Sequence, residues 1–380
     1  MTALFVTEII PFPIRGGEKL RSYALLKILS GTFDKVIAVI GKTKNNAFRD
    51  YKFENIDFHE FDFTLILTKN KYINCLKIFK KEKKLIYLFE KLLGENFIDI
   101  AFIDYHYNGQ YINYFKSKGI PVIYGTHNVQ SRIAYQRPSV SLKNKFSSTL
   151  EYFAYVIHEW YYFRKADALI VVSSNDYQYY KRYIADSKIF VIPNFLLKED
   201  YSLLNVEKSD YVIMTANFEA FQNIAGLDWF IKKVWTNKIF ENNRLLLVGI
   251  GSDVALEKQN QFNILKNIEA IGSVEDLKPY IAAAKVSVVP LLHGSGTRLK
   301  CIESMALRTQ LLSTSKGAEG IEHEGSIVIA DSPESFTKWL SDILNGEIDY
   351  THKAYYIFIN KYSLEPNHII FKNIIKQIIG

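Results

Sequence analysis

The sequence predicts an α/β protein with two tandem doubly wound domains, because short apolar, β-branched runs alternate with helical patterns and the whole series then restarts. In the first half, strands are expected at 3–7, 35–40, 98–103, 121–125, 168–172 and 188–192, with helices at 18–29, 72–93 and 146–164. In the second half, strands are expected at 211–215, 244–248, 268–271, 286–290, 310–313 and 326–329, with helices at 223–234, 274–283, 298–306 and 333–344. Strands that alternate with helices predict parallel sheets, whose ligands lie at the carboxyl ends of the strands.

Length supports the same division. A single core rarely grows beyond about 250 to 300 residues, and this chain has 380. The polar segment 193–208 has no periodicity and is the expected linker. We expect an N-terminal domain over 1–195 and a C-terminal domain over 205–350, facing each other across a cleft, with a C-terminal helix near 365–380 that packs back on the first domain.

Composition narrows the class of protein. With 48% hydrophobic and 23% charged residues, the chain is globular rather than disordered. Cys75 and Cys301 form no ligand pattern, so neither a disulfide framework nor a zinc site is predicted. The N-terminus lacks the pattern of a signal peptide, and no run approaches the ~18 apolar residues of a membrane span. We therefore expect a cytoplasmic protein, at most peripheral to the membrane.

Charge is unevenly distributed along the chain. Residues 1–195 carry 28 basic against 18 acidic side chains, and residues 196–380 carry 19 against 22. The basic half predicts an anionic partner. The run Lys69–Lys91 mixes lysines with apolar residues, as an interfacial helix on anionic lipid does; the alternative is a packed helix with solvated lysines.

The aromatic run 151–163 is expected in the core. No nucleic-acid motif is present, so nucleic acid is not an expected partner.

The segment 288–303 carries the strongest chemical signal. After a predicted strand come two glycines, two hydroxyl residues, two cations and a carboxylate: Gly294, Ser295, Gly296, Thr297, Arg298, Lys300 and Glu303. Glycines allow close approach of the backbone, and the amides that open a helix attract anions. Arg298 and Lys300 would bind phosphate oxygens, and Glu303 would accept hydrogen bonds from ribose hydroxyls. The alternative is a glycine loop that only turns the chain.

This segment resembles the donor loop and helix of one branch of the retaining glycosyltransferases of family 4, which have the GT-B fold. Shorter matches follow in the family's order at 11–18, 126–131, 191–194, 247–251 and 362–365. The resemblance implies transfer of a hexosyl group from a nucleotide diphosphate-sugar to a glycan or lipid-linked acceptor, with retention, in bacterial-type surface polysaccharide or glycoconjugate synthesis. It implies no cofactor besides the donor and no metal, and no Asp-X-Asp cluster follows a strand.

Three glycines and an arginine gain roles from this resemblance. Gly16 and Gly17 stand where the first strand leads into a helix and would face the donor diphosphate or sugar. Gly249, after a strand of the second half, would also contact the donor. Arg15 is an acceptor-side candidate. Without the resemblance, the Gly-Gly pair also fits an ordinary strand-to-helix turn.

His127 is the catalytic candidate. It follows the apolar strand that ends near Gly125, at the expected position of ligand sites, where an imidazole can orient the donor sugar. The alternative is a structural histidine. His106, after the preceding strand, is a second acceptor-side candidate.

Two departures from the family keep other functions open. Many relatives have a glutamate where this chain has Ser295, and the basic pair that many carry is absent from 217–223, so Arg298 and Lys300 are expected to supply the charge. The missing glutamate is the one hint of a non-catalytic partner subunit, and a nucleotide-sugar epimerase of the same fold, which would bind a similar donor, is the other alternative to a transferase.

Overall fold

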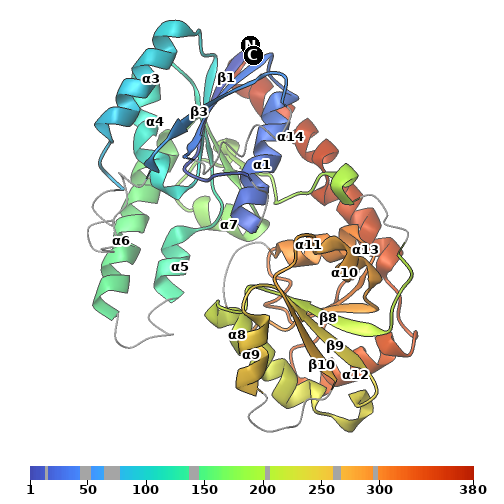
Figure 1. Ribbon diagram of the computed structural model, residues 1–380. Helices are drawn as coiled ribbons and strands as arrows, with labels where there is room; N and C mark the ends of the chain where they lie inside the picture. The colour runs from blue at the N-terminus through green and yellow to red at the C-terminus, as the bar shows by residue number, and fades with distance from the viewer. Residues whose placement is uncertain are drawn as a thin grey trace. The chain divides into compact units, whose positions relative to one another are not determined.

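The computed structural model describes residues 1–12, 16–42, 53–63, 78–136, 145–201, 206–259, 267–293 and 298–380. The chain forms two compact units (Figure 1). Unit 1 comprises Met1–Phe195 and Leu364–Gly380, and unit 2 comprises Leu196–Ser363. The chain thus passes from unit 1 to unit 2 after Phe195 and returns at Leu364.

The described part of unit 1 contains a parallel sheet in the order β3-β2-β1-β4-β5-β6-β7. Its strands are β1 (Thr2–Val6), β2 (Lys35–Gly41), β3 (Ile56–Phe61), β4 (Ile100–Asp104), β5 (Val122–Gly125), β6 (Ala168–Val171) and β7 (Ile189–Val191). The strand order reverses between β1 and β4, so ligands are expected at the carboxyl ends of these two strands.

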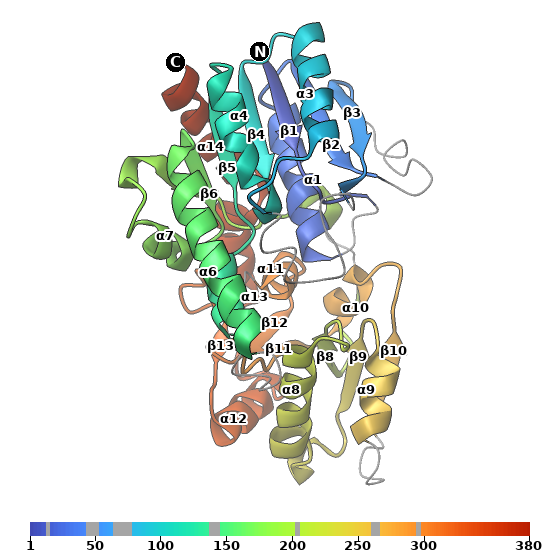
Figure 2. The same ribbon diagram turned by 90° about the vertical axis from the view of Figure 1, so that its left-hand side faces the viewer.

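Helices cover both faces of this sheet (Figures 1 and 2). They are α1 (Gly17–Ser30), α3 (Lys83–Glu95), α4 (Ile112–Ser117), α5 (Gln130–Gln136), α6 (Lys145–Tyr162), α7 (Ser174–Tyr180) and α14 (Leu364–Ile379), with short 3-10 turns at His106–Tyr111, Phe163–Lys165 and Asp186–Lys188. Successive strand residues face opposite sides. Leu4 joins the core beneath α3 and α4, whereas Phe102, which contacts Phe5, receives Phe371 of α14 at 6.0 Å between ring centroids.

Unit 2 repeats this plan in its described residues, with a parallel sheet in the order β10-β9-β8-β11-β12-β13. Its strands are β8 (Tyr211–Thr215), β9 (Arg244–Val248), β10 (Ile268–Gly272), β11 (Val286–Val289), β12 (Gln310–Ser313) and β13 (Val328–Ile329). Its helices are α8 (Phe221–Phe230), α9 (Ser252–Gln259), α10 (Lys278–Ala283), α11 (Leu299–Ala306), α12 (Pro333–Leu344) and α13 (Thr351–Ile357); π-helical turns at Ile231–Trp235 and Phe358–Tyr362 follow α8 and α13, and 3-10 turns lie at Lys198–Tyr201 and Lys238–Phe240. The order reverses between β8 and β11.

The strand pattern of the sequence is confirmed. Every strand expected from it is present, with ends that agree within two residues. β3 was not expected, because Ile56–Phe61 mixes apolar with polar residues and lies half-buried at an edge of the sheet, without the continuous apolar run of the central strands. Within the described ranges, no helix is both long enough and apolar enough to span a bilayer.

The helix expected at 72–93 is confirmed from Lys83 onward but does not include residues 78–82, because α3 starts only at Lys83. Glu82 caps this start: its carboxylate accepts from the Lys84 amide, and its own amide donates to Tyr111 Oη at 3.0 Å. Residues 64–77 lie outside the described residues, and so does much of the run Lys69–Lys91. In α3 the apolar side chains Leu85 and Phe89 are buried in the core, so its solvent face carries mainly charge.

The aromatic run 151–163 is not simply core. Tyr155 and Tyr162 of α6 are buried, but Phe153, Ile157 and Trp160 are 55%, 53% and 44% exposed. Helical periodicity places these three on one side of α6. The expectation was wrong for this side, because aromatic content alone does not say which helix face meets the core.

Candidate functional site

At the carboxyl edge of the sheet in unit 2, glycines bring neighbouring loops close together. Gly249, directly after β9, has φ +139°, and a Cβ there would lie 1.9 Å from the carbonyl oxygen of Ala216, which follows β8. After β12, a Cβ on Gly317 would lie 2.1 Å from the Val289 carbonyl oxygen at the end of β11. Larger residues cannot fit at either position. Gly249, a predicted donor contact, therefore lies at the edge where ligands are expected.

Charges from two strand ends meet at the start of α11. Arg298, the residue before the helix, is 8% exposed, and its Nε donates to the Lys316 carbonyl oxygen at 3.4 Å. Arg298 Nη2 lies 3.9 Å from Glu319 Oε2, and Lys316 Nζ lies 2.6 Å from the same carboxylate oxygen. Burial lowers the pKa of Arg298, an effect that Glu319 opposes. The predicted loop residues Gly294, Ser295, Gly296 and Thr297 lie outside the described residues.

Lys300 and Glu303, both predicted, lie on α11 itself. Lys300 Nζ is 3.5 Å from Asn223 Oδ1, and burial lowers the pKa of Lys300 to about 8. Glu303 Oε1 accepts a hydrogen bond from Tyr201 Oη at 3.1 Å. Burial raises the pKa of Glu303, although the Tyr201 hydroxyl and Lys300 act against this rise. The structure thus places Arg298, Lys300 and Glu303 within the first one and a half turns of α11 and the residue before it.

The sequence pattern alone does not single out four other side chains of this edge: Lys316, Glu319, Tyr201 and Asn223. Lys316 and Glu319 stand in the glycine-containing turn after β12, where their position at a strand end is a usable signal. Tyr201 and Asn223 give no such signal, because they reach α11 from distant parts of the chain.

At the carboxyl edge of the sheet in unit 1, a buried carboxylate collects polar partners. Asp104, which ends β4, accepts hydrogen bonds from Thr7 Oγ1 at 3.0 Å and from Ser22 Oγ at 2.8 Å. His127 Nε2 lies 2.8 Å from the other carboxylate oxygen and therefore carries the proton. Burial acts against ionisation of Asp104, yet His127, Arg21 and Ser22 hold the pKa of this carboxyl below its usual value.

His127 follows β5 as the sequence indicated, but only 3% of its side chain is exposed. Tyr105 packs edge-on against it, with ring centroids 5.0 Å apart. Tyr105 has φ +75°, an uncommon conformation for a residue other than glycine. Its hydroxyl donates to Glu18 Oε1 at 3.0 Å, and such strain persists only where the surroundings enforce it. Asp104 and Tyr105, which position His127, had been assigned no role from the sequence.

Three further predicted residues, Gly16, Gly17 and His106, lie near this edge. Gly16 precedes α1 with φ +87°, and Gly17 is the first residue of the helix; both are exposed. His106 opens the 3-10 turn after Tyr105, and its side chain lies outside the description, as does Arg15. Across the described ranges, no three His, Cys, Asp or Glu side chains gather as metal ligands would.

Comparison with solved structures defines the fold as GT-B, the class of two tandem Rossmann-like domains. HepE from Anabaena in complex with UDP is 12% identical, with a TM-score of 0.67 over 100% of both chains. The trehalose-6-phosphate synthase OtsA is 13% identical, with a TM-score of 0.68 over 100% of this chain and 99% of that one. A glycosyltransferase from Rickettsia africae is 15% identical, with a TM-score of 0.66 over 99% and 98%. At these identities the likeness shows the fold.

Sequence comparison adds a family match. Residues 209–346, most of unit 2, match the family model described as "Glycosyl transferases group 1". A Klebsiella pneumoniae protein described as an uncharacterized 44.6 kDa protein in the cps region is 25% identical over 178 residues, 44% of this chain and 45% of its own length. The matched region thus spans less than half of that relative. Fold and family match together support a glycosyltransferase.

Proposed function

We propose that the protein transfers a hexosyl group from a nucleotide diphosphate-sugar to a glycan or lipid-linked acceptor, with retention of anomeric configuration, in the synthesis of a surface polysaccharide or glycoconjugate. One observation carries the proposal: Arg298, Lys300 and Glu303 meet at a glycine-bounded strand edge, within the region that matches the glycosyltransferase model. The neighbour HepE in complex with UDP supports a nucleotide donor.

In this proposal the donor diphosphate lies at the amino end of α11. Negative charge develops on the departing nucleotide diphosphate, and cations fixed near it stabilise the transition state. Arg298 and Lys300 supply these cations together with the free amides of the helix start. With a pKa of about 8, Lys300 is mostly protonated at neutral pH. Glu303, held by Tyr201 Oη, accepts from the ribose hydroxyls, and neither a metal nor another cofactor takes part.

His127 is the proposed orienting group for the donor sugar. Its Nε2–H donates to Asp104, so the ring orientation and tautomer are fixed and Nδ1 is the nitrogen that accepts. Gly16, Gly17 and Gly249 provide close backbone approach to the donor. His106 and Arg15 are proposed acceptor-side residues.

We place the protein in the cytoplasm, with peripheral attachment to anionic lipid through the lysines of Lys69–Lys91. In the described part of this run, Lys80, Lys81, Lys83 and Lys84 are exposed. Lysines near a membrane surface are attracted to anionic headgroups at about 1 kcal/mol each. The attachment is therefore expected to be electrostatic.

The test is a thermal-shift panel of nucleoside diphosphates and their sugars, followed by titration with the best ligand. Arg298→Ala should weaken diphosphate binding by roughly 1.5 to 3 kcal/mol, the range of a charge-assisted hydrogen bond. Lys338→Ala, an exposed cation on α12, is the matched control. Glu303→Gln should weaken binding of the nucleoside part. Unchanged diphosphate affinity in the Arg298 variant would remove this residue from the site.

Assays on the same purified protein distinguish a transferase from the two alternatives, an epimerase and a non-catalytic subunit. An epimerase would convert the bound nucleotide-sugar without any acceptor, and product analysis by NMR would show the new sugar. A non-catalytic subunit would leave the nucleotide-sugar intact with every acceptor offered. Release of nucleoside diphosphate that depends on an acceptor supports the transferase.

A further inference from the structure

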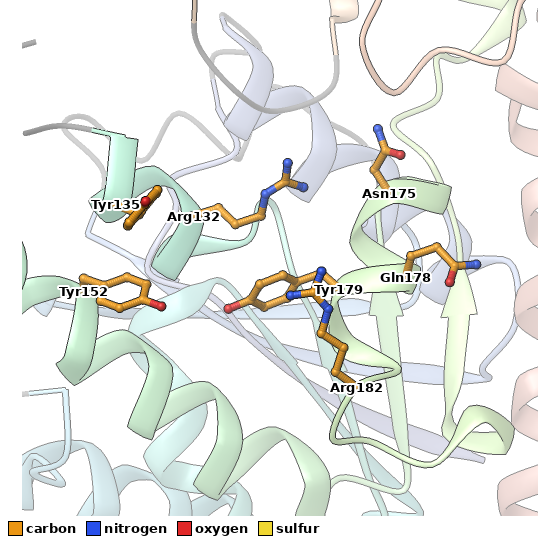
Figure 3. A pocket seen from close by; sticks show the side chains of 7 residues that line it. All are labelled: Arg132, Tyr135, Tyr152, Asn175, Gln178, Tyr179 and Arg182. Carbon is orange, nitrogen blue, oxygen red and sulfur yellow. The ribbon is translucent and has the colours of Figure 1, made fainter. Parts of the chain in front are cut away.

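Unit 1 contains a hollow that the proposed donor chemistry does not use. It has a volume of about 370 Å³ and is lined by side chains of α5, α6, α7 and the turn that follows α7 (Figure 3). Two arginines, three tyrosines and two side-chain amides form its wall, and none of these described lining residues is acidic. This volume lies in the range of small-molecule sites.

The aromatic part of the wall is built from both sides. Tyr135 of α5 and Tyr152 of α6 lie with ring centroids 5.6 Å apart, and Tyr135 is 70% exposed. Figure 3 shows the hydroxyl groups of Tyr152 and Tyr179 pointing toward one another. Flat rings with exposed faces offer apolar contact to the C–H face of a sugar ring, while their hydroxyls offer hydrogen bonds.

A buried network holds Tyr179 in place. Its hydroxyl lies 2.7 Å from Ser131 Oγ, which in turn donates to Glu159 Oε2 at 2.6 Å. The Ser131 amide donates to the other oxygen of Glu159 at 3.2 Å. Because Glu159 and Ser131 are 1% and 0% exposed, Tyr179 is held from inside the protein, and this part of the wall is preorganised for a ligand.

The cations are available for an anion. Arg132 and Arg182 form no ion pair with any described carboxylate; Arg182 lies with Cζ 5.3 Å from the centre of the Tyr179 ring. Guanidinium groups bind phosphate and carboxylate through paired N–H donors. Asn175 and Gln178 add amide groups that can bond to hydroxyls.

From this combination we infer that the hollow binds a saccharide that bears a phosphate or carboxylate group. α5 and α7 begin shortly after β5 and β6, so the hollow lies toward the carboxyl edge of the sheet, where doubly wound domains bind ligands. If the proposed transferase binds its acceptor in this hollow, the acceptor is an anionic sugar. This last step rests on the proposed function, whereas the binding does not.

Titration calorimetry on the full chain tests the inference with glucose 1-phosphate and glucuronic acid, against glucose and inorganic phosphate as partial ligands. The two anionic sugars should bind at least tenfold more tightly than either partial ligand. Arg132→Ala and Arg182→Ala should each weaken them at least tenfold. Lys181→Ala, an exposed neighbour outside the wall, and Arg298→Ala in unit 2 should leave the affinity unchanged.

Tyr135 provides a test that does not depend on a half-buried arginine. Tyr135→Ala should weaken glucose 1-phosphate severalfold and Tyr135→Phe should not, and the exposure of this side chain makes a folding defect from either change small. Equal binding of inorganic phosphate and glucose 1-phosphate would overturn the saccharide assignment. So would displacement of glucose 1-phosphate by sugar-free phosphatidylglycerol vesicles, which would indicate a lipid headgroup site.

The nucleotide separates the two proposals. Glucose 1-phosphate should bind equally well when the most stabilising nucleotide is present at saturation. Competition between them would place the sugar phosphate at the donor site and refute this inference. Nucleotide binding without anionic sugar binding refutes the inference alone, and the reverse result refutes the proposed function alone.

Discussion

Replacing Glu159 with glutamine is expected to remove a pH dependence of stability that this one carboxyl group creates. Burial raises the pKa of Glu159 from 4.5 to about 7, even though the Ser131 hydroxyl and amide, which favour the ionised form, lower it. Below pH 4.5 the carboxyl group is protonated in both the folded and the unfolded state. Between pH 4.5 and 7 the unfolded state releases the proton while the folded state keeps it, so the free energy of unfolding falls as pH rises.

The magnitude follows from the same pKa values. One pKa unit corresponds to about 1.4 kcal/mol, so the rise of the Glu159 pKa from 4.5 to about 7 amounts to about 3 kcal/mol lost by pH 8. Glutamine has no proton to release. The stability of Glu159→Gln relative to the original chain should therefore increase by about 3 kcal/mol between pH 4.5 and pH 8.

The assay is differential scanning calorimetry of both proteins across this pH range. The difference between the two curves is the informative quantity, because the other titrating groups are common to both proteins and cancel. A difference that stays constant from pH 4.5 to pH 8 would show that Glu159 is ionised in the folded state throughout, and would refute the reasoning.

Three further predictions concern the sites and the membrane. His127→Ala should lower the melting temperature, because it removes the hydrogen-bond partner that lies 2.8 Å from the buried Asp104. His127→Asn keeps a donor, so this variant should fold normally and bind the diphosphate with unchanged affinity, yet transfer the sugar at least tenfold more slowly. Full turnover in the folded His127→Asn variant would refute the catalytic assignment. Gly249→Ala should lower the free energy of unfolding, measured in urea, by about 1 to 3 kcal/mol or more, since its Cβ would meet the Ala216 carbonyl oxygen at 1.9 Å. Gly272 has φ +79° and nothing within 4 Å, so Gly272→Ala measures backbone strain alone, at about 1 to 2 kcal/mol. Equal losses in the two variants would contradict the steric argument. Anionic vesicles should retain the protein at low salt and release it at high salt. Replacing Lys80, Lys81, Lys83 and Lys84 with glutamine should abolish this retention. If the lysine variant is still retained, but a variant with serine at Phe153 and Trp160 is not, the exposed side of α6 is the membrane contact instead.

The sequence pattern places three charged residues close together at the carboxyl edge of unit 2, where we propose that the donor binds. Arg298, Lys300 and Glu303 follow one another within a single turn and a half of helix, so local spacing alone brings them together. Their partners were not readable, because Tyr201 is 102 residues away from Glu303 along the chain. No local pattern marks such a pair.

At the carboxyl edge of unit 1, the sequence indicated less of the arrangement and the tertiary structure decided more of it. The sequence singled out His127 from its position after a strand, but not that Asp104 would hold it, although Asp104 also ends a predicted strand. The two residues meet because β4 and β5 are neighbours in the sheet, and adjacency of parallel strands is a property of the topology rather than of either segment.

By itself, the sequence determined the two α/β units, most strands within them and the order of the cations that precede and open α11, because apolar runs and short spacings act through neighbours close along the chain. The tertiary structure alone decided which side of α6 meets solvent, how deeply His127 and Glu159 are buried, and that α5, α6 and α7 enclose a hollow lined by arginine and tyrosine. Burial removes water from a side chain, and the groups that replace this water come from segments far apart in the sequence, so the strength and the partners of each charge are set only when the chain has folded.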